Sequence, residues 1–236
     1  MKSRADAAPL LGLLLAAGCV GVRADAPPPS ERDSSQSPAS GHQRELISVE
    51  PNELAATSGE IAPLGPGRFA IHSPTLRAEL GRSPRSAAEV QFVYLGPTAS
   101  DAPLASGELR RQIGLKLRAR DTCNVVYVMW HVEPSSRIVV SVKSNPGQSR
   151  HEECGDRGYS VLASTSSESV PEVTVGQAHA LGAEIRGHEL WVTADGKTRW
   201  VGRLPNEAFE FDGPIGVRSD NGEFSVALRA EKVGPK

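Results

Sequence analysis

The sequence predicts an all-β domain, an antiparallel two-sheet sandwich of the jelly-roll kind, preceded by a disordered N-terminal tether. Three observations lead to this prediction. The 236 residues include 23 glycines and 18 prolines but only 2 methionines, every aromatic residue lies at or after Phe69, and apolar residues alternate with polar ones from about residue 68 onward. Turn-rich composition and period-two alternation are typical of β-proteins, and cores need large apolar side chains. We place the sandwich at residues 61–236.

About ten to twelve short strands and no long helix are expected from the alternation. Residues 125–132 are apolar on both faces, which predicts a central strand. Asp195-Gly196 separates two alternating runs and predicts a hairpin, because both turn positions require positive φ. Further half-buried strands are predicted at residues 76–80, 88–95, 113–119, 138–142, 181–185 and 224–228.

The amino terminus has the features of a secretion signal. Lys2 and Arg4 precede a short apolar run at residues 10–17, which is too short to span a bilayer. The run ends in Leu-Ala-Ala-Gly followed by Cys19, and this pattern resembles the bacterial lipobox. The resemblance implies a signal peptide at residues 1–18, cleavage before Cys19 and a lipid anchor on its thiol. An ordinary signal peptide with an incidental cysteine is the alternative.

The predicted localisation is the cell envelope, with the domain in the periplasm or at the cell surface. Val20, rather than an aspartate, follows Cys19. In the sorting scheme that the lipobox resemblance suggests, this implies the outer membrane rather than the inner one. Residues 19–60 are rich in Pro, Ser, Gln and Asp and are expected to form the tether, because such a composition buries too little apolar surface to offset the cost of ordering.

The chain has three cysteines, and this odd number agrees with the predicted envelope localisation. If Cys19 is acylated, Cys123 and Cys154 remain as a pair for a disulfide in an oxidising compartment. The alternatives are two free thiols or a zinc site that includes His131 and His151.

The segment from His179 to Phe224 resembles the concanavalin A-like lectin/glucanase sandwich, which also occurs in laminin-G-like modules. Members of this superfamily that hydrolyse glycans carry the motif Glu-x-Asp-x-x-Glu, since one carboxyl group protonates the leaving oxygen while another attacks or activates water. Glu210 and Asp212 begin such a motif, but Ile215 replaces its last glutamate. We therefore predict no catalytic residue and place Glu210 and Asp212 on a half-buried edge strand at residues 209–212.

A ligand-binding face is predicted around the central strand. If alternate residues of this strand face the core, Tyr127 and His131 point the other way, and Lys143 and Asn145 join them from the next strand. Trp191 also lies off the apolar face of its strand and is expected on the same surface. Aromatic rings beside polar groups suit sugars. In the alternative register, Tyr127 and His131 are buried between the sheets.

Several function classes are not supported by the sequence. A net charge of −2 gives no case for nucleic acid, and neither a P-loop, a Gly-x-Ser-x-Gly elbow nor a His-Glu-x-x-His motif is present. We predict no cofactor and no metal; calcium at Asp220 and Asn221 is the alternative to a simple turn.

The function hypothesis is a lipid-anchored envelope protein whose non-catalytic sandwich binds carbohydrate or a cell-wall polymer. One alternative is a glycan hydrolase with an atypical site, using carboxylates such as Glu153, Glu184 and Asp220. The other is a structural or protein-interaction lipoprotein.

Overall fold

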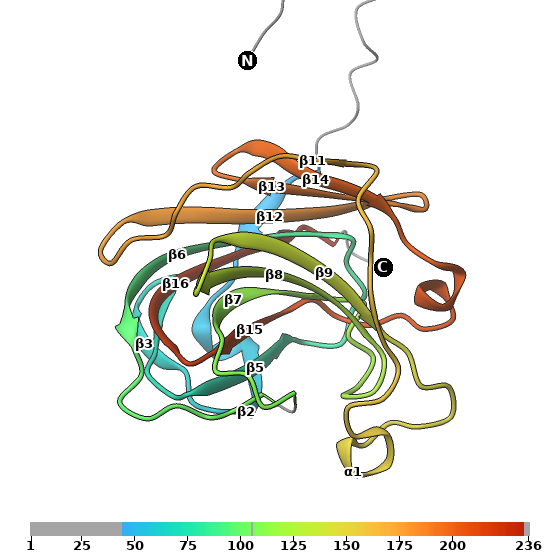
Figure 1. Ribbon diagram of the computed structural model, residues 1–236, viewed down its shortest axis with the longest axis horizontal. Coiled ribbons are helices and arrows are strands. Elements are labelled where there is room, and N and C mark those ends of the chain that lie inside the picture. Colours follow the sequence, from blue (N-terminus) through green and yellow to red (C-terminus); the bar gives the residue numbers. More distant parts are fainter. Residues whose placement is uncertain (1–43, 105, 234–236) are drawn as a thin grey trace, which may run out of the picture. The chain divides into compact units, whose positions relative to one another are not determined.

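The computed structural model of the chain describes residues 44–104 and 106–233 (Figure 1). The predicted signal peptide, Cys19 and the first part of the tether lie outside these residues and stay predictions. None of the helices within the described ranges has the length and apolar character needed to cross a membrane.

Two antiparallel sheets pack face to face, which confirms the predicted all-β, two-sheet sandwich (Figure 1). We call the nine-stranded layer sheet A and the seven-stranded layer sheet B. Sheet A contains β1 (Leu46–Ser48), β3 (Ala62–Gly65), β4 (Arg68–Ile71), β6 (Ala87–Pro97), β11 (Ser166–Ser167), β12 (Ala178–Arg186), β13 (Glu189–Ala194), β14 (Lys197–Arg203) and β16 (Gly222–Glu231).

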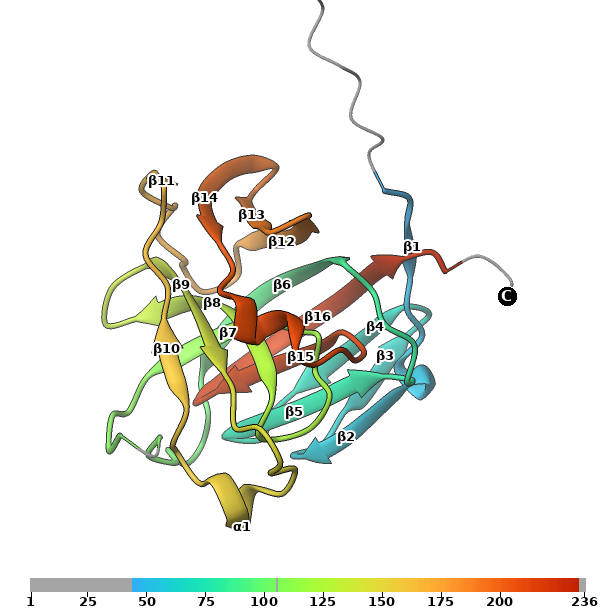
Figure 2. The ribbon, with the colours of Figure 1, turned by 90° about the vertical axis from the view of Figure 1, so that its right-hand side faces the viewer.

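Sheet B contains β2 (Leu54–Ser58), β5 (Thr75–Leu80), β7 (Arg111–Leu117), β8 (Val125–Glu133), β9 (Arg137–Lys143), β10 (Tyr159–Val161) and β15 (Gly216–Asp220). Its strands lie in the order β10-β9-β8-β7-β15-β5-β2, and several of them are seen side by side in Figure 2. The order in sheet A is β11-β14-β13-β12-β6-β16-β4-β3, with β1 added on β16. The helical segments are short: η1 (Pro51–Glu53), α1 (His151–Cys154) and η2 (Asn206–Phe209).

The described part of the sandwich begins earlier than residue 61. Residues 46–58, which we assigned to the tether, form β1, η1 and β2. Only Val49 and Leu54 of this segment are buried, so its sequence lacks the alternation of apolar and polar residues that predicts a strand. Its partners lie elsewhere in the chain, since β1 pairs with β16 and β2 pairs with β5.

Two local predictions have different outcomes. The Asp195-Gly196 hairpin, which joins β13 to β14, is confirmed, with φ of 51° and 74° at its two residues. Residues 209–212, by contrast, do not form an edge strand: they comprise the end of η2 and the loop after it. Pro205 and Pro214 flank this segment, and proline lacks the N–H that strand pairing needs.

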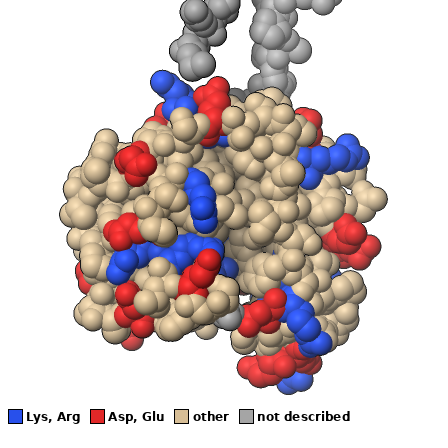
Figure 3. All heavy atoms as spheres, in the orientation of Figure 1, with Lys and Arg blue, Asp and Glu red and all other residues tan. Residues whose placement is uncertain are grey.

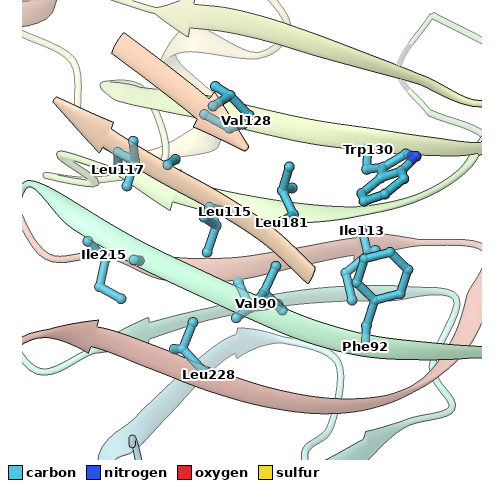
Figure 4. Packing of buried hydrophobic residues seen from close by; sticks show 14 of the residues in the cluster. Val90, Phe92, Ile113, Leu115, Leu117, Val128, Trp130, Leu181, Ile215 and Leu228 are labelled. Carbon is cyan, nitrogen blue, oxygen red and sulfur yellow. The ribbon is translucent and has the colours of Figure 1, made fainter. Parts of the chain in front are cut away.

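The core lies between the sheets and is built from the inward side chains of every long strand (Figure 4). Trp130 is its largest fully buried side chain. Its ring meets that of Phe92, from sheet A, edge to face at 5.6 Å, and its Nε1 donates a hydrogen bond to Ser136 Oγ at 2.8 Å. Trp130 thus joins the two sheets and also has its polar atom satisfied.

Replacing Trp130 by alanine should therefore lower the free energy of unfolding by about 3–5 kcal/mol, because a large cavity would open between the sheets. The measurement is urea unfolding followed by circular dichroism. The matched control is Trp191→Ala, since Trp191 is only half-buried and lies outside the core. Equal losses in the two variants would contradict this account of the core.

Candidate functional site on the outer face of sheet B

The central strand β8 divides its side chains between two environments. Val128 and Trp130 join the core between the sheets, whereas Tyr127 and His131 point to the outer side of sheet B, as the alternation predicted. We call this outer side the sheet B face. Tyr127 is 5% exposed and His131 is 2% exposed. Other side chains of the face therefore cover both residues.

An aromatic ring and a guanidinium group cover Tyr127. The ring of Tyr159, from the edge strand β10, stacks on it with centroids 6.1 Å apart and planes inclined by 21°. The guanidinium of Arg218, on β15, lies 4.7 Å from the centroid of the Tyr127 ring. Tyr159 is itself 43% exposed, so Tyr159 presents the aromatic surface of the face to solvent while Tyr127 supports it.

A fully buried carboxylate, Asp220 on β15, organises the arginines of the face. Its Oδ1 accepts a hydrogen bond from Arg77 Nη2 at 2.7 Å, and its Oδ2 accepts bonds from Arg218 Nε at 2.9 Å and Gln112 Nε2 at 2.6 Å. Burial alone would raise the pKa of Asp220, but the charges of Arg218 and Arg77 lower that pKa below its usual value. The carboxylate is therefore held in its ionised form.

His131 lies among arginines on the same face. Its Nδ1 accepts a hydrogen bond from Arg137 Nε at 3.2 Å, so the ring proton resides on Nε2. Burial, and after it the charges of Arg110 and Arg137, lower the pKa of His131 to about 3, against a smaller rise from Asp220. His131 is thus neutral at physiological pH, and the positive charge of the face comes from its arginines.

Lys143 braces a covalently closed loop beside the face. Cys123 and Cys154 form a disulfide, as predicted, and it ties the start of β8 to α1. Lys143 is 2% exposed, and its Nζ donates to the carbonyl oxygens of Thr122 at 3.1 Å and Gly155 at 2.6 Å, which are neighbours of the two cysteines. The structure therefore places Lys143 with Tyr127 and His131 but engages its ammonium in backbone contacts.

The other two predicted binding residues have different positions: Asn145 lies beside the disulfide-closed loop, and Trp191 lies on the other sheet. Asn145, in the loop after β9, donates from its Nδ2 to the carbonyl oxygens of Cys123 and Arg157. Trp191 lies on β13 in sheet A, so it does not share the face of Tyr127. The alternation of apolar and polar residues predicted that Trp191 points away from the core. It did not predict to which sheet its strand belongs.

The carboxylates considered for hydrolysis are dispersed. Glu153 lies on α1, Glu184 on β12 of sheet A and Asp220 on β15 of sheet B, while Glu210 and Asp212 follow η2. A glycosidase needs two carboxyl groups at one scissile bond, with the acid kept protonated. Asp220 is fully buried and held ionised, which is unsuited to that role.

The oxygens considered for calcium are engaged by protein donors. Both oxygens of Asp220 accept bonds from arginine or glutamine. Asn221 Oδ1 accepts a hydrogen bond from the backbone N–H of Ala102 at 2.7 Å, and its Nδ2 donates to the carbonyl of the same residue. Across the described ranges, no cluster of three or more His, Cys, Asp or Glu side chains is suited to a metal ion.

A hollow of about 440 Å³ crosses the outer side of sheet A. Its lining includes Gln91, Ala180 and Ser225, and its aromatic residues, Phe92 and His179, are buried. It offers a sugar no exposed ring on which to stack, which makes the sheet B face the stronger candidate.

Sequence reasoning missed Tyr159 and the arginines at the sheet B face. Arg77 and Arg218 are direct cross-strand neighbours on β5 and β15, although 140 residues separate the two in the chain. Figure 3 shows lysine and arginine side chains gathered over the region of β7 and β15, with acidic side chains beside them. Alternation within each strand indicates that these side chains point outward, but only the strand order shows that they meet.

No protein-family model matches the chain, and no curated protein matches it in sequence. Among solved structures, carbohydrate-binding module CBM66 from Bacillus subtilis is similar with a TM-score of 0.52 and 11% identity, over 74% of this chain and 92% of the module. An apo Crh5 transglycosylase has a TM-score of 0.48 and 12% identity, over 80% of this chain and 85% of that chain. A tetrameric galectin from the ball sponge Cinachyrella sp. has a TM-score of 0.41 and 8% identity, over 70% and 99%.

The chain therefore has the concanavalin A-like lectin/glucanase sandwich fold. This confirms, at the level of the fold, the resemblance seen between His179 and Phe224. A shared fold does not itself define an activity, so the function is argued from the site.

The lowered pKa of His131 predicts acid sensitivity. The folded state keeps His131 neutral down to a pKa of about 3, whereas the unfolded chain protonates it near 6.5. Stability should consequently fall by about 1 kcal/mol per pH unit as the pH drops from about 6.5 toward 3, because the unfolded state then binds more protons. Urea unfolding between pH 7 and 4.5 measures this slope. His131→Gln should flatten it, and identical slopes would contradict the assignment.

Proposed function

We propose that this chain is a lipid-anchored envelope protein whose sandwich binds a carbohydrate or cell-wall polymer on the sheet B face without cleaving it. The observation that carries the proposal is the exposed ring of Tyr159 beside the guanidinium of Arg218, with both stacked on Tyr127. Sugars stack their C–H faces on aromatic rings and hydrogen-bond through their rims, and this pair of groups offers both contacts.

The fold supports the same reading. The solved structure cited above with a TM-score over 0.5 is named a carbohydrate-binding module, and the chain covers 92% of it. Because the two sequences are only 11% identical, this likeness supports the proposal through the shared fold and not through shared site residues.

Binding is favoured over cleavage because the carboxylates of the face are already committed. Asp220 is buried among Arg77, Arg218 and Gln112, and Glu79 forms an ion pair with Lys116. A hydrolase would need one carboxyl group to be protonated and both to reach the substrate. Neither residue is arranged in that way.

The anchor is part of the proposal. The Cys123–Cys154 disulfide supports an oxidising compartment and leaves Cys19 as the unpaired cysteine of the sequence. Acylation of Cys19 would hold the protein in the envelope, in the outer membrane by the sorting resemblance given above, with its domain in the periplasm or at the surface.

Loss of the Tyr159 ring should weaken glycan binding. Tyr159→Ala should raise the Kd of the glycan or peptidoglycan found by an array screen of the full chain about five- to tenfold, since one stacked ring contributes about 1–1.4 kcal/mol. Isothermal titration calorimetry measures the change. Trp191→Ala, on sheet A, should leave the Kd unchanged. The proposal fails if no glycan binds at millimolar concentration, or if only the Trp191 variant is impaired.

Lipid attachment is tested separately at Cys19. Cys19→Ser should yield an uncleaved precursor without lipid, which mass spectrometry detects. The variant should also lose its stable lipid-mediated attachment to the membrane, which membrane fractionation measures. The double variant Cys123→Ala/Cys154→Ala, which removes the other two cysteines and their disulfide, should retain the lipid. An acylated Cys19→Ser protein would refute the anchor.

A further inference from the structure

The sheet B face carries more cations than carboxylates. Its charged side chains come from β5, β7, β9 and β15 and from the residue that precedes β7, and they bracket β8. The cations are Arg77, Arg110, Lys116, Arg137, Lys143 and Arg218, and the carboxylates are Glu79 and Asp220. This excess occurs in a chain whose formal net charge is −2, so it is a local feature of this face.

Both carboxylates are used within the face. Glu79 pairs with Lys116, and Asp220 is shared by Arg77 and Arg218. Arg77 and Arg218 lie directly opposite each other on adjacent strands, an arrangement of like charges that is unfavourable without a carboxylate to join them. One buried carboxylate therefore serves two arginines, which leaves one positive charge uncompensated.

Arg218 presents a fixed pair of donors. Its Nε donates to Asp220 and its Cζ lies over the ring of Tyr127, 4.7 Å from the centroid, so the guanidinium is held at two points. Besides Asp220, its only side-chain hydrogen-bond partner within residues 44–104 and 106–233 is the hydroxyl of Tyr159, and the side chain is 12% exposed. A guanidinium that is oriented through Nε and stands beside the Tyr159 hydroxyl keeps Nη donors for the oxygens of a carboxylate or sulfate.

Arg137 repeats this arrangement with a neutral partner. Its Nε donates to Nδ1 of His131 at 3.2 Å, and in the part of the chain that the structure describes it forms no ion pair and no hydrogen bond through Nη. Because His131 is neutral at physiological pH, it orients Arg137 without compensating its charge.

A third arginine increases the positive field. Arg110 has its pKa lowered by burial and then by the charges of Arg137 and Arg218. Its acidic partner, Glu108, lies on an exposed loop rather than on the sheet. An anion that approaches this group of three arginines would meet preformed donors and a favourable potential.

We propose that the ligand of the sheet B face is an acidic saccharide, whose carboxylate or sulfate group accepts hydrogen bonds from the Nη groups of Arg218 and Arg137. The inference rests on the proposed function, since it specifies the charge of a glycan bound there. Tyr159 stacks on the sugar ring, and the arginines select the acid group. A neutral sugar would gain the stacking but leave the two guanidinium groups without their strongest partners.

The test compares matched polymers that differ only in charge. Binding of the full chain to polygalacturonate is measured against its methyl-esterified form, and dextran sulfate against dextran, by affinity electrophoresis at 0.15 M NaCl. At least one acidic member should bind about tenfold or more tighter than its neutral partner, and the preference should diminish as salt is raised. A DNA duplex of equal charge density serves as a further arm.

Three substitutions locate the effect. Arg218→Gln and Arg137→Gln should each abolish most of the acidic preference. Arg137 makes no ion pair within the described residues, so its variant keeps the test valid if Arg218→Gln proves unstable. The matched control is Arg186→Gln, because Arg186 also lies over an aromatic ring, 4.8 Å from the Trp191 centroid, but on sheet A. It should leave the preference unchanged.

Each outcome bears on the inference in a definite way. Acidic preference that is lost in both sheet B variants supports it. Equal binding of acidic and neutral members overturns it while the proposed carbohydrate-binding function stands. Failure of both acidic polymers to bind, or a DNA duplex that binds as tightly as they do, also overturns it, and the neutral arms and the array screen then decide the proposed function separately.

Discussion

The buried carboxylate of Asp220 is the interaction on which the sheet B face depends. Three neighbouring strands, β5, β15 and β7, each contribute a donor to it through Arg77, Arg218 and Gln112. Breaking a buried, hydrogen-bonded ion pair costs about 3–5 kcal/mol, because the partner charge is left uncompensated. The arrangement thus serves the sheet, which it crosslinks, and the face, where it sets the direction of Arg218.

The opposite end of the face is fixed by a different means. The disulfide and the two carbonyl contacts of Lys143 hold the segment from α1 to β10, and Tyr159 begins that strand. Tyr159 therefore stands on an edge strand that begins five residues after the disulfide-closed loop, whereas Arg218 stands on a central strand. A ligand that contacts both would meet two rigid elements, which keeps the ordering cost of binding low.

Much of the fold and part of the site were predictable from local patterns. Alternation on β8 gave the outward direction of Tyr127 and His131, the Asp195-Gly196 pair gave a hairpin, and cysteine arithmetic gave the disulfide. Patterns within one strand do not record which strands become neighbours. Arg77, Arg137 and Arg218 were consequently not recognised as one group, and Trp191 was assigned to the wrong sheet. The strands β1, β2 and β10 are short and bury few side chains, so pairing with distant strands, rather than any local signal, defines them.

The short strand β1 has a mechanical consequence. Its three residues pair with the end of β16, and Arg44 adds ion pairs to Glu184 and Glu231. For a protein tethered through Cys19 and bound to an immobile polymer, as proposed, tension along the chain reaches the sandwich at β1. This strand would peel from β16 first, and each released residue would add about 3.3 Å of length. Under that proposal, β1 would detach under tension before the packed sheets separate.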